Sequence, residues 1–263
     1  MKTPLPLLFL LLAFCGGLLA APPEKKAPES SKQQPYTPEA DLRGRWVFQA
    51  EPALPNVLIL GDSISIAYTL PVREKLRGKA NVFRPMRPDK QPDNCGDTPR
   101  GLAMLEKWLG DTRWDVIHFN WGLWDLCHRH PESKEQGNRD KVNGKLSTPP
   151  EDYERNLEKL VARLKATGAR LVWASTTVVP EGEAGRFVGD DAKYNAIAAR
   201  VMEHHHIPVN DLYATSKAFA PAMFVKPGDV HFTTEGSAKL AAQVAEVIST
   251  NLKPPRGHDP DSR

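Results

Sequence analysis

Short apolar runs alternate with longer amphipathic segments along most of the chain. The apolar runs predict strands at 56–60, 81–84, 115–120, 170–175 and 208–210, and the amphipathic segments predict helices at 64–76, 99–109, 150–167, 190–206 and 234–251. Strand and helix in regular alternation predict a mostly parallel sheet with helices on both faces. Handedness and crossover rules then give a three-layer α/β/α sandwich with a doubly wound sheet of about five strands, whose ligand sites lie at the carboxyl ends of the strands.

The start of the chain has a different pattern. A lysine precedes a Leu-rich run and then small residues, which is typical of a secretory signal peptide over 1–21, cut near Ala20 or Ala21. Two alternatives stay open: a retained transmembrane anchor, for which the run is barely long enough, and a lipoprotein signal ending at Cys15, which the bulky Phe14 disfavours. We expect export to the periplasm or the cell exterior, without stable membrane insertion after cleavage.

Polar segments flank the region of alternation. Residues 22–41 are rich in Pro, Lys, Glu, Ser and Gln and predict a flexible linker, because such a segment cannot bury enough apolar surface to order itself. Residues 254–263 predict a disordered tail, which leaves one catalytic domain over 42–253. Within it, the polar stretch 128–148 predicts a surface insertion or lid.

Composition fits a single globular domain and excludes some partners. Of the 263 residues, 40% are hydrophobic and 25% are charged, which is sufficient for one sizeable core. The formal net charge is +3, and acidic and basic residues are interspersed. No basic patch follows from this pattern, so we expect no nucleic-acid partner.

A serine stands where the first predicted strand breaks into a turn. It belongs to Gly61-Asp62-Ser63, and near the other end of the chain Asp229 and His231 supply a carboxylate and an imidazole. A serine hydroxyl needs a base within hydrogen-bond reach to act as a nucleophile, and histidine is suited to that task. The two segments therefore predict acyl transfer, although Gly-Asp-Ser also occurs in ordinary turns.

From about residue 55 to 252 the chain resembles the SGNH, or GDSL-type, hydrolase family, and in particular its carbohydrate esterases. The four family blocks correspond to Gly61-Asp62-Ser63, Asn94-Cys95-Gly96-Asp97-Thr98, Asn120-Trp121-Gly122-Leu123-Trp124-Asp125 and Asp229-Val230-His231. The resemblance implies Ser63 as nucleophile, His231 as base, and the backbone N–H groups of Ser63 and Gly96 as oxyanion donors. It also implies a reaction without a metal or an organic cofactor.

Two positions depart from the family pattern. The acid usually stands three residues before the histidine, where this chain has Gly228. Asp229, two residues before, either orients His231 or leaves a dyad in which a backbone carbonyl does so. Trp124 occupies the place of the family asparagine. The side-chain oxyanion donor is therefore either the Trp124 indole N–H or the amide of Asn120.

These residues have plainer interpretations as well. Asn120 can satisfy backbone groups at a strand end, and Trp124 can stack on a sugar or pack its own loop. Trp121 and Trp124 lie where a substrate would pass, and with Asp62 they are the candidate substrate-binding residues. Core packing is the alternative for the tryptophans.

Two cysteines remain after removal of a leader, and both flank the predicted site. In an oxidising compartment, a disulfide between Cys95 and Cys127 would tie the second block to the third. Two separate buried thiols are the equal alternative.

The other conspicuous histidines do not predict a metal site. His204, His205 and His206 are consecutive on a predicted helix, point in different directions and lack further ligands at suitable spacing, so we expect a solvated helix end. His118 lies inside a predicted strand and is expected to be a core residue or a support for the site.

The function expected from the sequence is that of an exported serine esterase that removes small acyl groups, acetyl above all, from a carbohydrate. One alternative is a lysophospholipase or broad carboxylesterase of the same fold. Another is a non-catalytic glycan-binding protein on a degenerate hydrolase scaffold, which the altered third block keeps open.

Overall fold

The computed structural model describes residues 46–130 and 139–252. The predicted signal peptide (1–21), linker (22–41) and tail (254–263) lie outside the described residues, as does part of the polar stretch 128–148. Among the described residues, no helix combines the length and the apolar character needed to cross a membrane.

A five-stranded parallel sheet forms the centre of the domain. Its strands are β1 (Asn56–Leu60), β2 (Asn81–Phe83), β3 (Val116–Phe119), β6 (Arg170–Ala174) and β7 (Val209–Asn210), in the spatial order β2-β1-β3-β6-β7. Every neighbouring pair is parallel. The middle strands are buried on both faces, which is why their sequences are continuous apolar runs rather than alternating ones.

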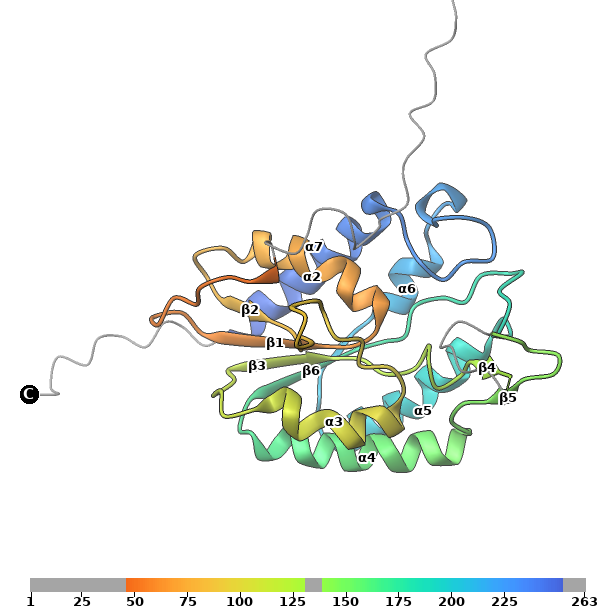
Figure 1. The fold of residues 1–263 in the computed structure, drawn as a ribbon, viewed down its shortest axis with the longest axis horizontal. Coiled ribbons are helices and arrows are strands. Elements are labelled where there is room, and N and C mark those ends of the chain that lie inside the picture. The colour runs from red at the N-terminus through yellow and green to blue at the C-terminus, as the bar shows by residue number, and fades with distance from the viewer. Residues whose placement is uncertain (1–45, 131–138, 253–263) are drawn as a thin grey trace, which may run out of the picture. The chain divides into compact units, whose positions relative to one another are not determined.

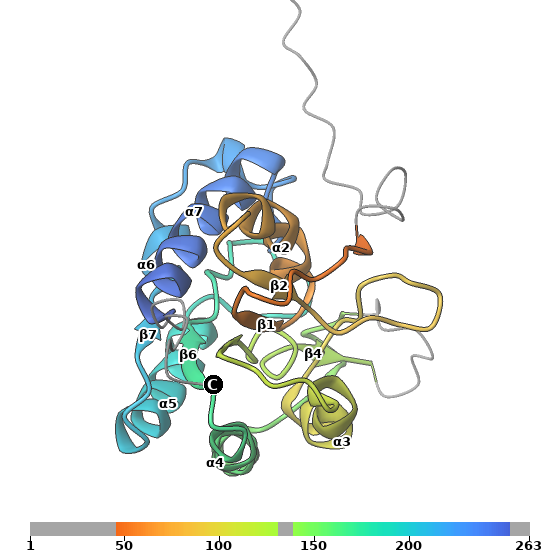
Figure 2. The ribbon, with the colours of Figure 1, turned by 90° about the vertical axis from the view of Figure 1, so that its left-hand side faces the viewer.

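Helices cover both faces of this sheet. One layer contains α2 (Ser63–Lys75), α6 (Leu212–Lys217) and α7 (Thr234–Asn251), and the other contains α3 (Thr98–Leu109), α4 (Pro150–Ala166) and α5 (Asp190–His204) (Figures 1 and 2). The helices bury their apolar stripes against the sheet and join its strands in one continuous core. The predicted three-layer α/β/α sandwich with a doubly wound sheet is therefore confirmed.

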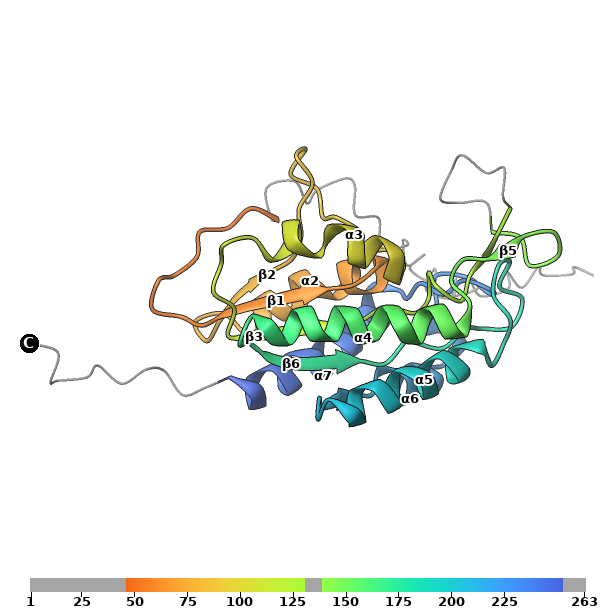
Figure 3. The ribbon, with the colours of Figure 1, turned by 90° about the horizontal axis from the view of Figure 1, so that it is seen from below.

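All ten predicted strands and helices are present, with ends that shift by one or two residues. The sequence did not predict α6, a 3₁₀ turn at Pro221–Met223, or the small hairpin of β4 (His128–Arg129) and β5 (Lys145–Leu146), which projects at one end of the domain (Figure 3). These pieces are too short for hydrophobic periodicity to reveal them.

The order of the strands places Ser63 at an edge of the sheet where ligands can bind. The chain passes from β1 to β2 on one side and returns to β3 on the other side of β1. The loops after β1 and β3 therefore diverge, and open α/β sheets bind ligands at such a switch point. Ser63 is the first residue of α2 and follows the end of β1 by three positions.

Candidate active site

Ser63 and His231 meet although 168 residues separate them in sequence. The distance from Ser63 Oγ to His231 Nε2 is 2.8 Å. Ser63 lies at the start of α2, and His231 lies just before α7, the helix that packs beside α2. Both side chains are partly exposed, with the imidazole 42% accessible. An ester can thus reach a hydroxyl that already contacts its base.

Asp229 contacts the other nitrogen of the same ring. Its Oδ1 accepts from His231 Nδ1 at 2.6 Å and from the His231 backbone N–H at 3.0 Å. Partial burial acts to raise the pKa of Asp229, but these two bonds and nearby positive charge outweigh it and lower the pKa to about 2. The carboxylate is therefore ionised at neutral pH and fixes Nδ1 as the protonated nitrogen.

The unusual position of the acid has a steric reason. Gly228 has a φ of +71°, and a Cβ at this position would lie 2.7 Å from the Gly182 carbonyl oxygen. No aspartate fits there. The acid stands one residue later, and the tight turn at Gly228 brings Asp229 back to the imidazole.

Asp62 holds the turn that carries the nucleophile. Its Oδ1 accepts the Ile64 N–H at 2.9 Å, which caps the start of α2. The side chain is buried, and burial raises its pKa despite the bond from Ile64 and the nearby basic groups. The expectation that Asp62 binds substrate is wrong, because its carboxyl group faces the protein interior.

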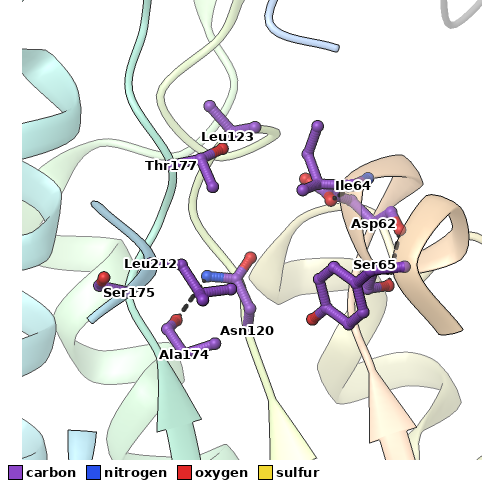
Figure 4. Close-up of a pocket in the computed structure, with 10 residues that line it drawn as sticks. Asp62, Ile64, Ser65, Asn120, Leu123, Ala174, Ser175, Thr177 and Leu212 are labelled. Atoms are coloured by element: carbon purple, nitrogen blue, oxygen red, sulfur yellow. Dashed lines mark hydrogen bonds between the residues drawn. The ribbon is translucent and has the colours of Figure 1, made fainter. Parts of the chain in front are cut away.

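A small cavity lies behind this turn (Figure 4). It measures about 10 Å³, and Asp62, Ile64, Asn120, Leu123 and Thr177 are among its lining residues. That volume holds about one water molecule. The Thr177 hydroxyl is buried and has no hydrogen-bond partner among the described residues, so the wall is polar enough to hold a water.

The predicted oxyanion donors differ in their availability. The Ser63 N–H belongs to the first turn of α2, whose N–H groups have no partner within the helix. The Gly96 N–H donates to Asn94 Oδ1 at 2.9 Å. Gly96 can therefore serve an oxyanion only when the half-buried Asn94 side chain turns away.

Asn120 satisfies backbone groups at the end of a strand, the simpler of the two roles expected for it. Its Nδ2 donates to the Ala174 carbonyl at 2.8 Å and to Thr176 Oγ1 at 3.3 Å, which ties the end of β3 to the end of β6 (Figure 4). An amide nitrogen has two hydrogens, and both are used here. Asn120 can reach an oxyanion only by giving up one of these bonds.

The two tryptophans of the third block have different surroundings. Trp121 is 1% exposed, and its indole N–H donates to the Cys95 carbonyl at 3.4 Å. The expectation that it lies on the path of a substrate is therefore wrong, and its alternative as a core residue is correct. Trp124 is half-buried, and the Arg129 guanidinium lies 4.4 Å from its ring centre. Trp124 keeps an accessible surface beside the site.

Cys95 and Cys127 are both free and buried, so the predicted disulfide is not formed. Cys95 follows the Asn94 turn, with its N–H on the Gly61 carbonyl at 3.1 Å, whereas Cys127 Sγ lies 3.6 Å from the His128 carbonyl. The alternative of two separate buried thiols holds.

Asp125, at the end of the third block, links this block to the second. Its Oδ1 accepts from both the backbone N–H and the hydroxyl of Thr98, the first residue of α3. Burial raises the pKa of Asp125 to about 7. The sequence places Asp125 in the third block, but we did not predict that it would bind Thr98 of the second block. A carboxylate beside the start of a helix was the available signal.

A buried ion-pair cluster joins the third block, residues 120–125, to the segment around Glu183. Glu183 is fully buried and accepts from Arg139 and Arg186, both at 2.8 Å, while Arg186 Nε donates to the Leu123 carbonyl at 2.6 Å. The third block is thereby fixed to the segment that packs on Gly228. Sequence analysis missed this cluster because Arg139 is 44 positions from Glu183, and Leu123 is 63 positions from Arg186.

The described residues contain no group of three or more His, Cys, Asp or Glu side chains that could hold a metal ion. His118 is buried in β3 and bonds to Asn210 at 3.1 Å, as expected of a core residue. His205 bonds to Glu158 at 2.6 Å on the surface, away from the catalytic pair.

Comparison with known proteins identifies the family. Residues 59–239 match the model of the GDSL-like lipase/acylhydrolase family, and no curated protein sequence matches the chain. The chain belongs to this family, the SGNH/GDSL hydrolases, which are esterases and acylhydrolases that act on ester bonds.

Solved structures confirm the fold at low sequence identity. The acetyl xylan esterase AlAXEase has a TM-score of 0.58 at 13% identity, covering 73% of this chain and 99% of its own. The lipase/acylhydrolase from Enterococcus faecalis has a TM-score of 0.60 at 17% identity, covering 76% and 98%. LAE5, an α/β hydrolase from the metagenome of Lake Arreo in Spain, has a TM-score of 0.56 at 16% identity, covering 77% and 96%.

Proposed function

We propose that this protein is an exported serine esterase that removes acetyl or similarly small acyl groups from a carbohydrate, with Ser63, His231 and Asp229 as its triad. The observation that carries the proposal is the continuous chain of contacts from Ser63 Oγ to His231 Nε2 and from His231 Nδ1 to Asp229 Oδ1, at 2.8 and 2.6 Å. This is the order of groups that a serine nucleophile needs.

Acylation begins when Ser63 Oγ attacks the ester carbonyl carbon. His231 Nε2 takes the hydroxyl proton, and the ionised Asp229 stabilises the imidazolium through Nδ1–H. When the C–O bond to the leaving alcohol breaks, the imidazolium returns the proton to that alcohol. A water molecule then attacks the acyl-enzyme with the same histidine as base, which releases the acid and restores Ser63.

The tetrahedral intermediate carries a negative oxygen that needs donors. The Ser63 N–H supplies one, and the Gly96 N–H supplies a second once its bond to Asn94 has opened. Trp124 is the candidate for a third, because its side chain keeps accessible surface whereas the Asn120 amide is engaged. One such donor is worth roughly 10²- to 10³-fold in rate.

A short acyl group is supported by one of the structural relatives, AlAXEase, which is an acetyl xylan esterase of similar fold.

Three observations support a carbohydrate as the alcohol component and export as its setting. Trp124, in the loop after β3, is half-buried and keeps some accessible aromatic surface, and aromatic rings stack on sugar rings. The start of the chain has the pattern of a signal peptide. One of the structural relatives is an acetyl xylan esterase.

The test is acetate release from a panel of acetylated polysaccharides by the wild type and by Ser63→Ala, beside hydrolysis of p-nitrophenyl acetate and octanoate. We expect release by the wild type alone and a preference for acetate over octanoate. A preference for octanoate would instead favour a lysophospholipase or broad carboxylesterase. Tight polysaccharide binding without any hydrolysis would favour the glycan-binding alternative.

A further inference from the structure

Arg84 is a buried cation directly after β2. The residue is 4% exposed, and burial lowers the pKa of its guanidinium. Among the described residues it forms no ion pair with a carboxylate within 4.0 Å, and its Nε has no hydrogen-bond partner. Burying a charged group without a close counter-ion is unfavourable. The position therefore calls for a purpose other than stability.

Two of the four hydrogen bonds of Arg84 go to the two turns that carry the backbone oxyanion donors. One terminal nitrogen donates to the Gly61 carbonyl at 3.4 Å and to the Asp93 carbonyl at 2.9 Å. Gly61 stands two residues before Ser63, and Asp93 stands three residues before Gly96. A single guanidinium nitrogen thus contacts both turns.

The second terminal nitrogen of Arg84 fixes the helix that follows the nucleophile. It donates to Ser65 Oγ at 3.3 Å and to Thr69 Oγ1 at 3.0 Å, both on the buried side of α2. A further bond joins the two turns without Arg84, because the Cys95 N–H donates to the Gly61 carbonyl at 3.1 Å. Arg84 adds rigidity to a contact that one backbone bond would otherwise hold.

We propose that Arg84 is a positioning residue that holds the Ser63 and Gly96 backbone N–H groups at the separation that one oxyanion requires. A planar guanidinium can hold two carbonyls and two hydroxyls in a fixed geometry, which the point charge of a lysine cannot. The inference rests on the proposed esterase function. It assigns to Arg84 an effect on the transition state and not on substrate binding, because a donor that aims at the oxyanion acts only when charge develops there.

The experiment compares Arg84→Met and Arg84→Lys with Arg73→Met in the full-length protein. Arg73 is a matched control, because it donates to the carbonyls of Val82, in the same strand β2, and of Trp46, at 3.0 and 3.3 Å, and neither carbonyl belongs to the two turns. The measurements are kcat and KM for p-nitrophenyl acetate, the Ki of phenylboronic acid, and the melting temperature. The boronic acid forms a tetrahedral anion on Ser63 and therefore reports the oxyanion site separately from substrate binding.

We expect Arg84→Met to lower kcat about 10- to 100-fold, to raise the Ki of the boronic acid by a similar factor, and to leave KM within about threefold. Arg84→Lys should fall between this variant and the wild type. Arg73→Met should keep kcat and Ki, whatever happens to its melting temperature. If Arg84→Met fails to fold, Arg84→Lys replaces it in the test, and we again expect a lower kcat and a higher Ki for the boronic acid.

Two results would overturn the inference: a kcat and Ki of both Arg84 variants within about threefold of the wild type, or equal losses in the Arg73 control. The failure of the proposed function is a separate result. In that case the wild type itself would show no hydrolysis that depends on Ser63, and both proposals would fall together.

Discussion

Asp229 and His231 form two hydrogen bonds with each other across a single intervening residue. Asp229 Oδ1 accepts the imidazole Nδ1–H at 2.6 Å and the His231 backbone N–H at 3.0 Å. The bond from the His231 backbone N–H closes a local turn that orients the Asp229 carboxylate. In this orientation the carboxylate also accepts the ring Nδ1–H. A spacing of two residues thereby allows one carboxylate to contact both the ring and the backbone of His231.

Replacing Asp229 by asparagine should lower kcat for p-nitrophenyl acetate by about 10²- to 10⁴-fold with little change in KM. The asparagine keeps the size of the side chain but loses the negative charge that stabilises the imidazolium. Asp89→Asn is the control, because Asp89 also accepts a backbone N–H but is exposed and pairs with Arg87. Near-normal kcat in Asp229→Asn would show that a Ser–His dyad is sufficient.

Asn94 provides a second prediction, because its side chain occupies the N–H of Gly96. Asn94→Ala removes this acceptor, so we expect kcat for p-nitrophenyl acetate to stay at the wild-type value or to rise by up to about tenfold. Steady-state kinetics beside the exposed control Asn143→Ala would measure this. A fall of more than about tenfold in Asn94→Ala alone would mean that the Asn94 amide itself binds the oxyanion.

Asp125 gives a prediction about pH and stability. Burial raises its pKa from the ordinary 3.8 to about 7, and its Oδ2 has no hydrogen-bond partner among the described residues. Between these two pH values the folded protein keeps a proton that the unfolded chain has lost. Folding therefore takes up a proton in this window, and the contribution of Asp125 to stability falls as the pH rises from about 4 to about 7.

Asp125→Asn should remove this pH dependence. Asparagine can still accept from Thr98 through its oxygen and never ionises. The free energy of unfolding of the variant minus that of the wild type should increase by about 2 to 4 kcal/mol between about pH 4 and pH 8, because only the wild type loses stability in this range. Urea titrations at several pH values would measure it, with Asp111→Asn as an exposed control. A constant difference between variant and wild type would contradict the raised pKa.

The layout of the fold could be predicted from the sequence because the strands and long helices have strong periodic patterns. The run 57–60 and the amphipathic segment 234–251 are two examples, and both are present as β1 and α7. The hairpin of β4 and β5 has two residues in each strand and gives no periodic pattern. Its existence depends on tertiary contacts.

At the site, predictions held for contacts that short motifs encode and failed for those that packing decides. The short last block offered Asp229 or a backbone carbonyl as the group that orients His231, and the structure has the Asp229 contact. The burial of Trp121 depends on Gly101 of α3, whose Cβ, if present, would lie 2.9 Å from the indole. The separation of Cys95 from Cys127 likewise depends on how two loops fold. No local sequence pattern predicts the burial of Trp121 or the absence of a bond between the two cysteines.

The central claim is that Ser63 is a nucleophile activated by His231. The most direct measurement is covalent labelling of the full-length protein by a fluorophosphonate, followed by peptide mass spectrometry, in the wild type, Ser63→Ala and Ser65→Ala. The account predicts one adduct, on Ser63, that persists in Ser65→Ala and is absent from Ser63→Ala. An unlabelled wild type, or labelling that survives in Ser63→Ala, would contradict it.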